Sequence, residues 1–406
     1  MLSARGKKLR WPLGITLELL FALLSIIGVA ALLIAEKNVH IWLPAYISNA
    51  AIRADRRSAR EAADVVHVIF AIVDHFEPVV EPGHDPADKK DAMADWLARY
   101  PALAGRHRDS DGRPPRHTWV YPLETYDPEH LTQLVGLCRR GLGEIEVHIH
   151  HANDTSETFR ARMQTGLRLF AKHGVNTVRG IEGHRFVFVH GNWALDNSGC
   201  GCGVNDELQI LRELGCFVDM TLPSAPNCAQ TRKINSVYYA TDDPKRPKSH
   251  DDGVDVEVGG SPSGDLMILQ GPLRPDWANR KYGIFPRIDN ADLTNVATGR
   301  PARLDAWVDL GIGVVGRPEW VFIKAHTHGA HRHTREALLG KPADEMFTHL
   351  EQTYASGRYR LHYVTAREMY NMVKAAEAGK TGNPYDYRDF AIPPYDCVRG
   401  VSTARR

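Results

Sequence analysis

Two histidines on one strand face are the strongest sign of chemistry in this chain. The run EIEVHIHH occupies residues 144–151, and alternate side chains of a β-strand point to the same side, so His148 and His150 share a face. Neutral imidazole is the commonest side-chain metal ligand, and two of them form half of a metal site. Glu144 and Glu146 precede them on this face and are expected to be structural acids deeper in the fold. The alternative is a buried strand whose histidines are satisfied by hydrogen bonds.

Three other expected strands also end in histidine or acid. Asp74, His75 and Glu77 follow the first of them, His190, Asn192 and Trp193 the second, and His326 and His328 the third. The parallel strands of a βα barrel end on a common rim, where such enzymes carry their active sites. We therefore predict a metal-centred site at this rim. His151 and His328 are expected to be polar loop residues rather than ligands.

The expected secondary structure alternates strands with helices. Strands are expected at residues 65–73, 117–121, 144–150, 186–189, 217–221, 320–324 and 359–364, with helices between most of them. Asp127 before Pro128 predicts a helix start, and Thr365 with Glu368 forms a capping-box pattern. The rhythm weakens over residues 228–295. An exposed insertion is expected at 242–255, and 234–239, 254–258 and 266–270 are candidate strands that could include a hairpin. Six or seven strand–helix units predict an α/β fold whose parallel sheet closes into a barrel.

This order of strand-end residues resembles the polysaccharide deacetylase superfamily, which includes carbohydrate esterase family 4 and related glycoside hydrolases. The resemblance covers residues 65–373 and implies a distorted (β/α)7 barrel with a divalent metal. Three departures stand out. Asp74-His75 replaces the usual adjacent aspartates, and one residue rather than three separates His148 from His150. The arginine–proline–tyrosine segment is absent, and the run HGNW at residues 190–193 takes its place in the order.

The resemblance implies that Asp74, His148 and His150 bind Zn²⁺ or another divalent cation. An equally allowed arrangement makes Asp74 the base and His75 a ligand, and the residues do not choose between the two. The metal would lower the pKa of its bound water towards about 7 and polarise an acyl carbonyl.

The same resemblance implies roles for residues that move protons. Glu77 or His75 would remove the proton of the attacking water, and His326 would protonate the leaving amine. Asn192 or a backbone N–H would stabilise the oxyanion.

The implied function is a metal-dependent hydrolase that removes acyl groups, such as acetyl, from a carbohydrate polymer outside the cytoplasm. One alternative is a glycoside hydrolase of the same superfamily, with two carboxylates across the scissile bond. Asp74 with Glu77 or Glu146 could supply them. The other is a non-catalytic glycan-binding or assembly protein on a degenerate barrel, because a fold does not imply a function.

The N-terminal segment is expected to be a membrane anchor. Four basic residues, Arg5, Lys7, Lys8 and Arg10, precede a long apolar run at residues 13–35. About 20 apolar residues can cross a bilayer, and the basic flank would keep the N-terminus in the cytoplasm. A cleaved signal peptide is the alternative. The predicted organisation is an anchor at residues 1–36, a juxtamembrane linker at 37–63, the barrel at 64–377 and a tail at 378–406.

Composition adds two limits. The formal net charge of +1 over 406 residues leaves no basic footprint for nucleic acid. Six cysteines would lie outside the cytoplasm under this topology, where disulfides are allowed, but their spacing does not fix a pairing.

Overall fold

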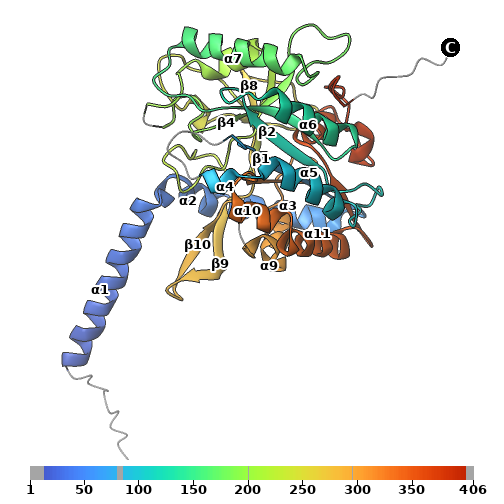
Figure 1. Cartoon of the computed structure of the whole chain (residues 1–406). Coiled ribbons are helices and arrows are strands. Elements are labelled where there is room, and N and C mark those ends of the chain that lie inside the picture. Colours follow the sequence, from blue (N-terminus) through green and yellow to red (C-terminus); the bar gives the residue numbers. More distant parts are fainter. Residues whose placement is uncertain (1–12, 80–85, 200, 295, 399–406) are drawn as a thin grey trace, which may run out of the picture.

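The structure, a computed structural model, describes residues 13–79, 86–199, 201–294 and 296–398 (Figure 1). The four basic residues expected before the first helix and Cys200 lie outside these ranges. Every residue predicted for the site lies within them.

One ten-stranded sheet forms the centre of the molecule, in the order β11-β1-β2-β3-β4-β5-β8-β6-β7, with β12 also paired to β1. The strands are β1 (Val66–His75), β2 (His117–Pro122), β3 (Gly143–Ile149), β4 (Phe186–His190), β5 (Cys216–Asp219), β6 (Val237–Ala240), β7 (Val254–Asp255), β8 (Leu266–Leu269), β11 (Trp320–Thr327) and β12 (Tyr359–Tyr363). Pairing is parallel from β11 through β8, and β6 and β7 join antiparallel at the edge. The predicted α/β fold with a parallel sheet is confirmed.

The two ends of the parallel series approach each other, which makes the sheet barrel-like. Gly271 follows β8, and a Cβ atom there would lie 2.2 Å from the backbone oxygen of Lys324 on β11. Lys324 also donates to the backbone oxygen of Met220, at 2.8 Å. The resemblance implied a barrel of seven strand–helix units closed by hydrogen bonds. Within the described ranges no hydrogen-bonded ladder joins β8 to β11, and the two strands meet instead at the close approach of Gly271 to Lys324.

Both faces of the sheet are buried against other elements, and β1 is accordingly apolar on both sides. Val68 and Phe70 face one core with the helices that follow the strands, whereas Ile69 and Ala71 face a second core with Met372 of the last long helix. A parallel strand buried on both faces must be apolar throughout. The covering helices are α4 (Pro86–Lys89), α5 (Ala92–Ala104), α6 (Pro128–Arg139), α7 (Ser156–Ala171), α8 (Glu207–Glu213), α9 (Pro301–Leu310), α10 (Arg332–Leu338), α11 (Lys341–Tyr354) and α12 (Ala366–Glu377).

The predicted helix starts are confirmed. Asp127 accepts hydrogen bonds from the backbone N–H groups of Glu129 and His130 at the start of α6. Thr365 and Glu368 form a reciprocal capping box at the start of α12. Each cap satisfies donors that would otherwise lack a partner.

Helix α1 (Leu13–Glu36) leads the described chain and projects away from the body (Figure 1). No helix in the described ranges combines the length and the apolar character needed to cross a membrane. The predicted transmembrane anchor is therefore not supported. That prediction depended on an apolar run which Thr16, Glu18 and Ser25 interrupt.

The segments expected to be linker and tail are packed against the body. Trp42 of α2 (Val39–Ser48) is buried with Ala225 and Leu273, and α3 (Ala50–Ala62) follows it. Tyr395, beyond the last long helix, is fully buried and donates to Glu146 at 2.9 Å. No disulfide joins the described cysteines to one another.

Candidate metal centre

The Glu77 carboxylate lies between two imidazoles at the C-terminal ends of β1 and β3. Its Oε1 atom is 3.3 Å from His148 Nε2 and 3.5 Å from His150 Nε2. On its other side, Oε2 is 3.6 Å from Lys89 Nζ. The three side chains form a group whose ligand atoms all lie within 4.8 Å of one another. The strand ends therefore bring the predicted histidine pair to an acid that follows a different strand.

Hydrogen bonds on the far side of each ring fix which nitrogen is a possible ligand. His148 Nδ1 lies 2.9 Å from the Val189 backbone oxygen, which can only accept, so Nδ1 carries the proton and Nε2 holds the lone pair. His150 Nδ1 lies 2.6 Å from Glu124 Oε1 and follows the same logic. Metal-binding histidines characteristically donate their other N–H to a carbonyl or a carboxylate. Both rings thus turn a lone pair towards Glu77.

A second group shares Glu77 and widens the site. The ligand atoms of His75, Glu77 and His328 also lie within 4.8 Å of one another. The His75 ring is 4.8 Å from the His148 ring and 4.7 Å from the His328 ring, measured between centroids. His328 follows β11, and the sequence analysis placed it in a polar loop. It joins the site because β11 is the neighbour of β1 in the sheet.

The donor set fits a divalent metal. Two ligands about 2.0–2.1 Å from a tetrahedral ion lie roughly 3.3–3.4 Å apart, which is close to the distances from Glu77 to the two imidazoles. His148 Nε2 and His75 Nδ1 are buried with no hydrogen-bond partner among the described residues. Buried polar atoms normally have partners, so these orphaned nitrogens indicate a missing ligand. The site is compatible with a divalent cation.

The Glu77 carboxyl group is held in its ionised form by its neighbours. Burial alone would raise the pKa of Glu77, but the close approach of His148, His150 and His328 holds that pKa below the ordinary value. Burial is also the main reason why the pKa of His75 is well below its ordinary value, with His328 and His148 adding to it. A metal requires its carboxylate ligands ionised and its imidazole ligands neutral.

Asp74 lies outside both ligand groups. Its carboxylate is fully buried and accepts hydrogen bonds from His117 Nε2 at 2.9 Å and from the Gly329 backbone N–H at 2.5 Å. Trp96 donates to the Gly329 backbone oxygen at 2.9 Å. Asp74 therefore fixes the backbone directly after His328, which makes it a positioning residue in this geometry.

His326 and Asn192 lie beside the ligand groups. The Trp193 ring contacts both His326 and His75, with its centroid 5.1 Å from the His326 ring and 4.5 Å from the His75 ring. The Asn192 side-chain oxygen accepts the backbone N–H of His151 at 3.1 Å, which ties the end of β3 to the end of β4. The structure thus brings the predicted site residues to one rim, with Asp74 beneath it and Asn192 in its wall.

Glu124 is the residue that the sequence analysis missed. It follows β2, whose end was not among the four strand ends considered, and it accepts both the backbone N–H and the Nδ1–H of His150, at 2.8 and 2.6 Å. The signal was available, since an acid directly after an expected strand is the same pattern that singled out Asp74.

We expect Glu124→Gln to weaken metal binding by about 10–100-fold, because losing a carboxylate behind a ligand histidine has typically that effect. Chelator competition measures the affinity. Glu129→Gln, on the exposed side of α6, is the control and should bind metal as the unmodified chain does. Equal affinities in the two variants would contradict the role given to Glu124.

A third buried group, His151, His190 and Glu207, is less suited to a metal. The Asn192 backbone N–H donates to His190 Nδ1 at 3.1 Å, so the ring proton of neutral His190 lies on Nε2. That atom faces Glu207 Oε1 at 3.7 Å and is a donor rather than a ligand.

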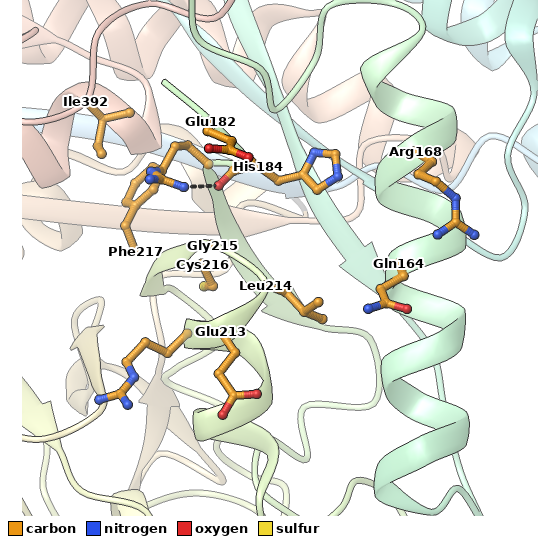
Figure 2. Close-up of a pocket in the computed structure, with 13 residues that line it drawn as sticks. Gln164, Arg168, Glu182, His184, Glu213, Leu214, Gly215, Cys216, Phe217 and Ile392 are labelled. Carbon is orange, nitrogen blue, oxygen red and sulfur yellow. Dashed lines mark hydrogen bonds between the residues drawn. The ribbon is translucent and has the colours of Figure 1, made fainter. Parts of the chain in front are cut away.

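A hollow of about 810 Å³ lies away from this chemistry. Figure 2 shows its lining, with Gln164 and Arg168 from α7 on one side and Glu213 and Leu214 from the end of α8 on another. His184 and the segment at residues 215–217 place it at the N-terminal ends of β4 and β5. In βα barrels this end supports stability, and the C-terminal end carries the active site.

Two solved structures are similar to this chain at low sequence identity. A crystal structure from Mycobacterium smegmatis with the proposed assignment of polysaccharide deacetylase is 14% identical, with a TM-score of 0.41, over 79% of this chain and 93% of that one. A structure from Parabacteroides distasonis, with the proposed assignment of glycoside hydrolase or deacetylase, is 13% identical, with a TM-score of 0.37, over 74% of this chain and 69% of that one. No protein-family model and no curated protein matches the sequence.

Proposed function

We propose that this protein is a metal-dependent hydrolase that removes acyl groups from a carbohydrate. The observation that carries the proposal is the arrangement around Glu77, in which His148 and His150 turn their lone pairs inwards while Val189 and Glu124 hold the opposite nitrogens. If these histidines were only satisfied by hydrogen bonds in the core, the inward-facing nitrogen of His148 would be expected to have a hydrogen-bond partner. The acyl and carbohydrate parts of the proposal come from the family resemblance in the sequence.

Glu77, His148 and His150 would hold the ion, with His75 and His328 next to it. Two histidines and one glutamate are the ligand set of several catalytic zinc sites, so we propose Zn²⁺. When bound, the metal supplies a Lewis acid for the acyl carbonyl and lowers the pKa of water. Because Glu77 belongs to the ligand set in this arrangement, it is no longer the first candidate for the base.

The proton-transfer role then falls to His326, with His75 as the nearer alternative. Burial, together with Lys324 and His328, keeps the pKa of His326 well below its ordinary value, so its ring is neutral. Its buried Nδ1 atom has no hydrogen-bond partner among the described residues and can accept a proton. We propose that it takes a proton from the attacking water and returns it to the leaving group. The Trp193 ring beside it helps to exclude bulk water.

A glycoside hydrolase is less well supported by this geometry. It needs two carboxylates that face each other across an open site, about 5–10 Å apart. Asp74 is buried and already accepts two hydrogen bonds, and Glu146 is buried against Tyr395. Neither is available to a sugar. A location outside the cytoplasm remains a proposal drawn from the N-terminal sequence pattern.

The test uses the full chain. We expect the purified protein to contain close to one equivalent of divalent metal, measured by elemental analysis, and to release acetate from an acetylated sugar polymer. A chelator should abolish release, and added Zn²⁺ should restore it. Metal without acetate release would point to a non-catalytic binding protein, and release that resists complete metal removal would overturn the proposal.

A further inference from the structure

A two-stranded hairpin stands apart from the main sheet and exposes large apolar side chains. It consists of β9 (Arg274–Lys281) and β10 (Phe285–Asp289), which pair only with each other. Trp277, Tyr282 and Ile284 lie on it with 57%, 72% and 52% of their surfaces exposed. Soluble proteins seldom gather exposed apolar side chains in this way unless something covers them.

The base of the hairpin is held rigidly by buried charges. Asp289 accepts from Arg303 Nε and from Trp307 Nε1, both at 3.0 Å, and so joins the hairpin to α9. Asp276 pairs with Arg300 at 2.7 Å. An isolated hairpin is marginally stable in water, so these contacts are what keep its tip extended from the body.

The hairpin and the N-terminal helices enclose an apolar cleft of about 630 Å³. Its lining includes Leu33 and Ile34 of α1, Trp42 of α2, and Phe285 and Ile288 of the hairpin. Figure 1 shows α1 and the β9–β10 hairpin leaving the body on the same side. The cleft therefore opens between two projecting elements, both with exposed apolar side chains.

Positive charge surrounds this apolar surface. Lys37, Lys281 and Arg287 line the cleft, and Arg280 lies over the Trp277 ring at 5.8 Å. Glu36, at the end of α1, pairs with Lys37 at 3.0 Å, and the other carboxylate of α1 is Glu18, about five turns away along the helix. Exposed Trp and Tyr with a basic fringe are the combination found where proteins meet the headgroup region of a bilayer.

We propose that the hairpin and the cleft together form a docking surface for an anionic lipid bilayer. Trp277, Tyr282 and Ile284 would enter the headgroup region, and the cleft would receive an acyl chain. The basic side chains would contact the anionic headgroups, each contributing favourably close to the surface. This contact needs no membrane-spanning helix and does not depend on the proposed hydrolase activity.

The test measures sedimentation of the full chain with phosphatidylcholine vesicles, with and without phosphatidylglycerol. We expect binding that increases with phosphatidylglycerol and weakens with salt. The double variant Trp277→Ser with Ile284→Ser should lose most of its vesicle binding. The variant Lys281→Gln should bind the anionic vesicles with about fivefold lower affinity. The control is Val254→Ser, on β7, because Val254 is 63% exposed and lies away from the hairpin.

Because α1 is unchanged in all these variants, a difference between them reports on the hairpin. Circular dichroism confirms that the variants are folded. Binding by the double variant equal to that of the Val254→Ser control would overturn the proposal, as would equal binding to neutral and anionic vesicles. A concentration-dependent dimer that the double variant loses would overturn it too, and would assign the surface to a second copy of the chain.

Discussion

The Glu77→Gln variant is expected to lose both its bound metal and its hydrolytic activity. The substitution preserves the shape of the side chain but removes the negative charge that lies between His148 and His150. Metal affinity should fall by more than the about 10–100-fold expected when a group behind a ligand is changed. Elemental analysis of the purified variant and acetate release measure the two effects, and activity should match that of the chelated unmodified chain.

The matched comparison is Asp74→Asn. Asp74 holds the Gly329 N–H and His117 rather than the ligand group, so this variant should keep its metal while its turnover falls. Glu336→Gln serves as the surface control, because Glu336 only pairs with Arg99 on the outside of the molecule. If Asp74→Asn loses metal and Glu77→Gln retains it, the ligand roles are the reverse of those proposed here.

The largest expected effect on stability comes from a buried ion pair below the site. Both Glu144 and Arg367 are almost fully buried, and Arg367 donates to the carboxylate through Nε and Nη2 at 2.8–3.1 Å. Thr365 donates a further hydrogen bond at 2.6 Å. Glu144→Ala would leave the buried guanidinium without this partner, and we expect the free energy of unfolding to fall by about 3–5 kcal/mol in urea denaturation.

The control for that variant is Glu213→Ala. Glu213 pairs with Arg160 at 2.6 Å, but both side chains are substantially exposed, and such pairs contribute about 0–1 kcal/mol. A loss in Glu144→Ala no larger than in this control would contradict the structural role of the pair.

The same pair predicts a pH dependence with a definite sign. Burial alone would raise the pKa of Glu144, but Arg367 and Arg116 lower it below the ordinary value of 4.5. A carboxylate with a lowered folded pKa contributes fully above its unfolded pKa and loses that contribution as the pH falls through the folded value. The stability difference between the unmodified chain and Glu144→Ala should therefore be complete near neutral pH and shrink below about pH 4.5.

The sequence was sufficient to predict which histidines share a strand face at the rim, because the alternation of side chains along a strand is a local property. His148 and His150 share a face because the period of a strand is two, and no distant residue can change that. The strands that lead to Glu77 and carry His326 were found from the same kind of local pattern. Glu144 and Glu146 were expected to be structural acids. Both are buried, and they precede His148 by four and two residues on the same strand face.

Other assignments needed neighbours that the sequence does not specify. Asp74 was expected at the metal because of its place in the family pattern, yet in the structure the backbone after His328 and the His117 ring occupy its oxygens. His328 was expected in a polar loop and instead faces His75. The β9–β10 hairpin lies within residues 228–295, but outside the expected insertion at 242–255 and outside the candidate strands at 234–239, 254–258 and 266–270.

The amino-acid order alone therefore determined that this chain forms a parallel α/β sheet with histidines and acids at its strand ends, since local periodicity and helix caps decide those features. The tertiary structure decided which acid meets which imidazole. Strands that are far apart in sequence became neighbours, as β1 and β11 did, and hydrogen bonds from Val189 and Glu124 then set which ring nitrogens face Glu77. Those contacts depend on the relative position of whole strands, which a local pattern does not encode.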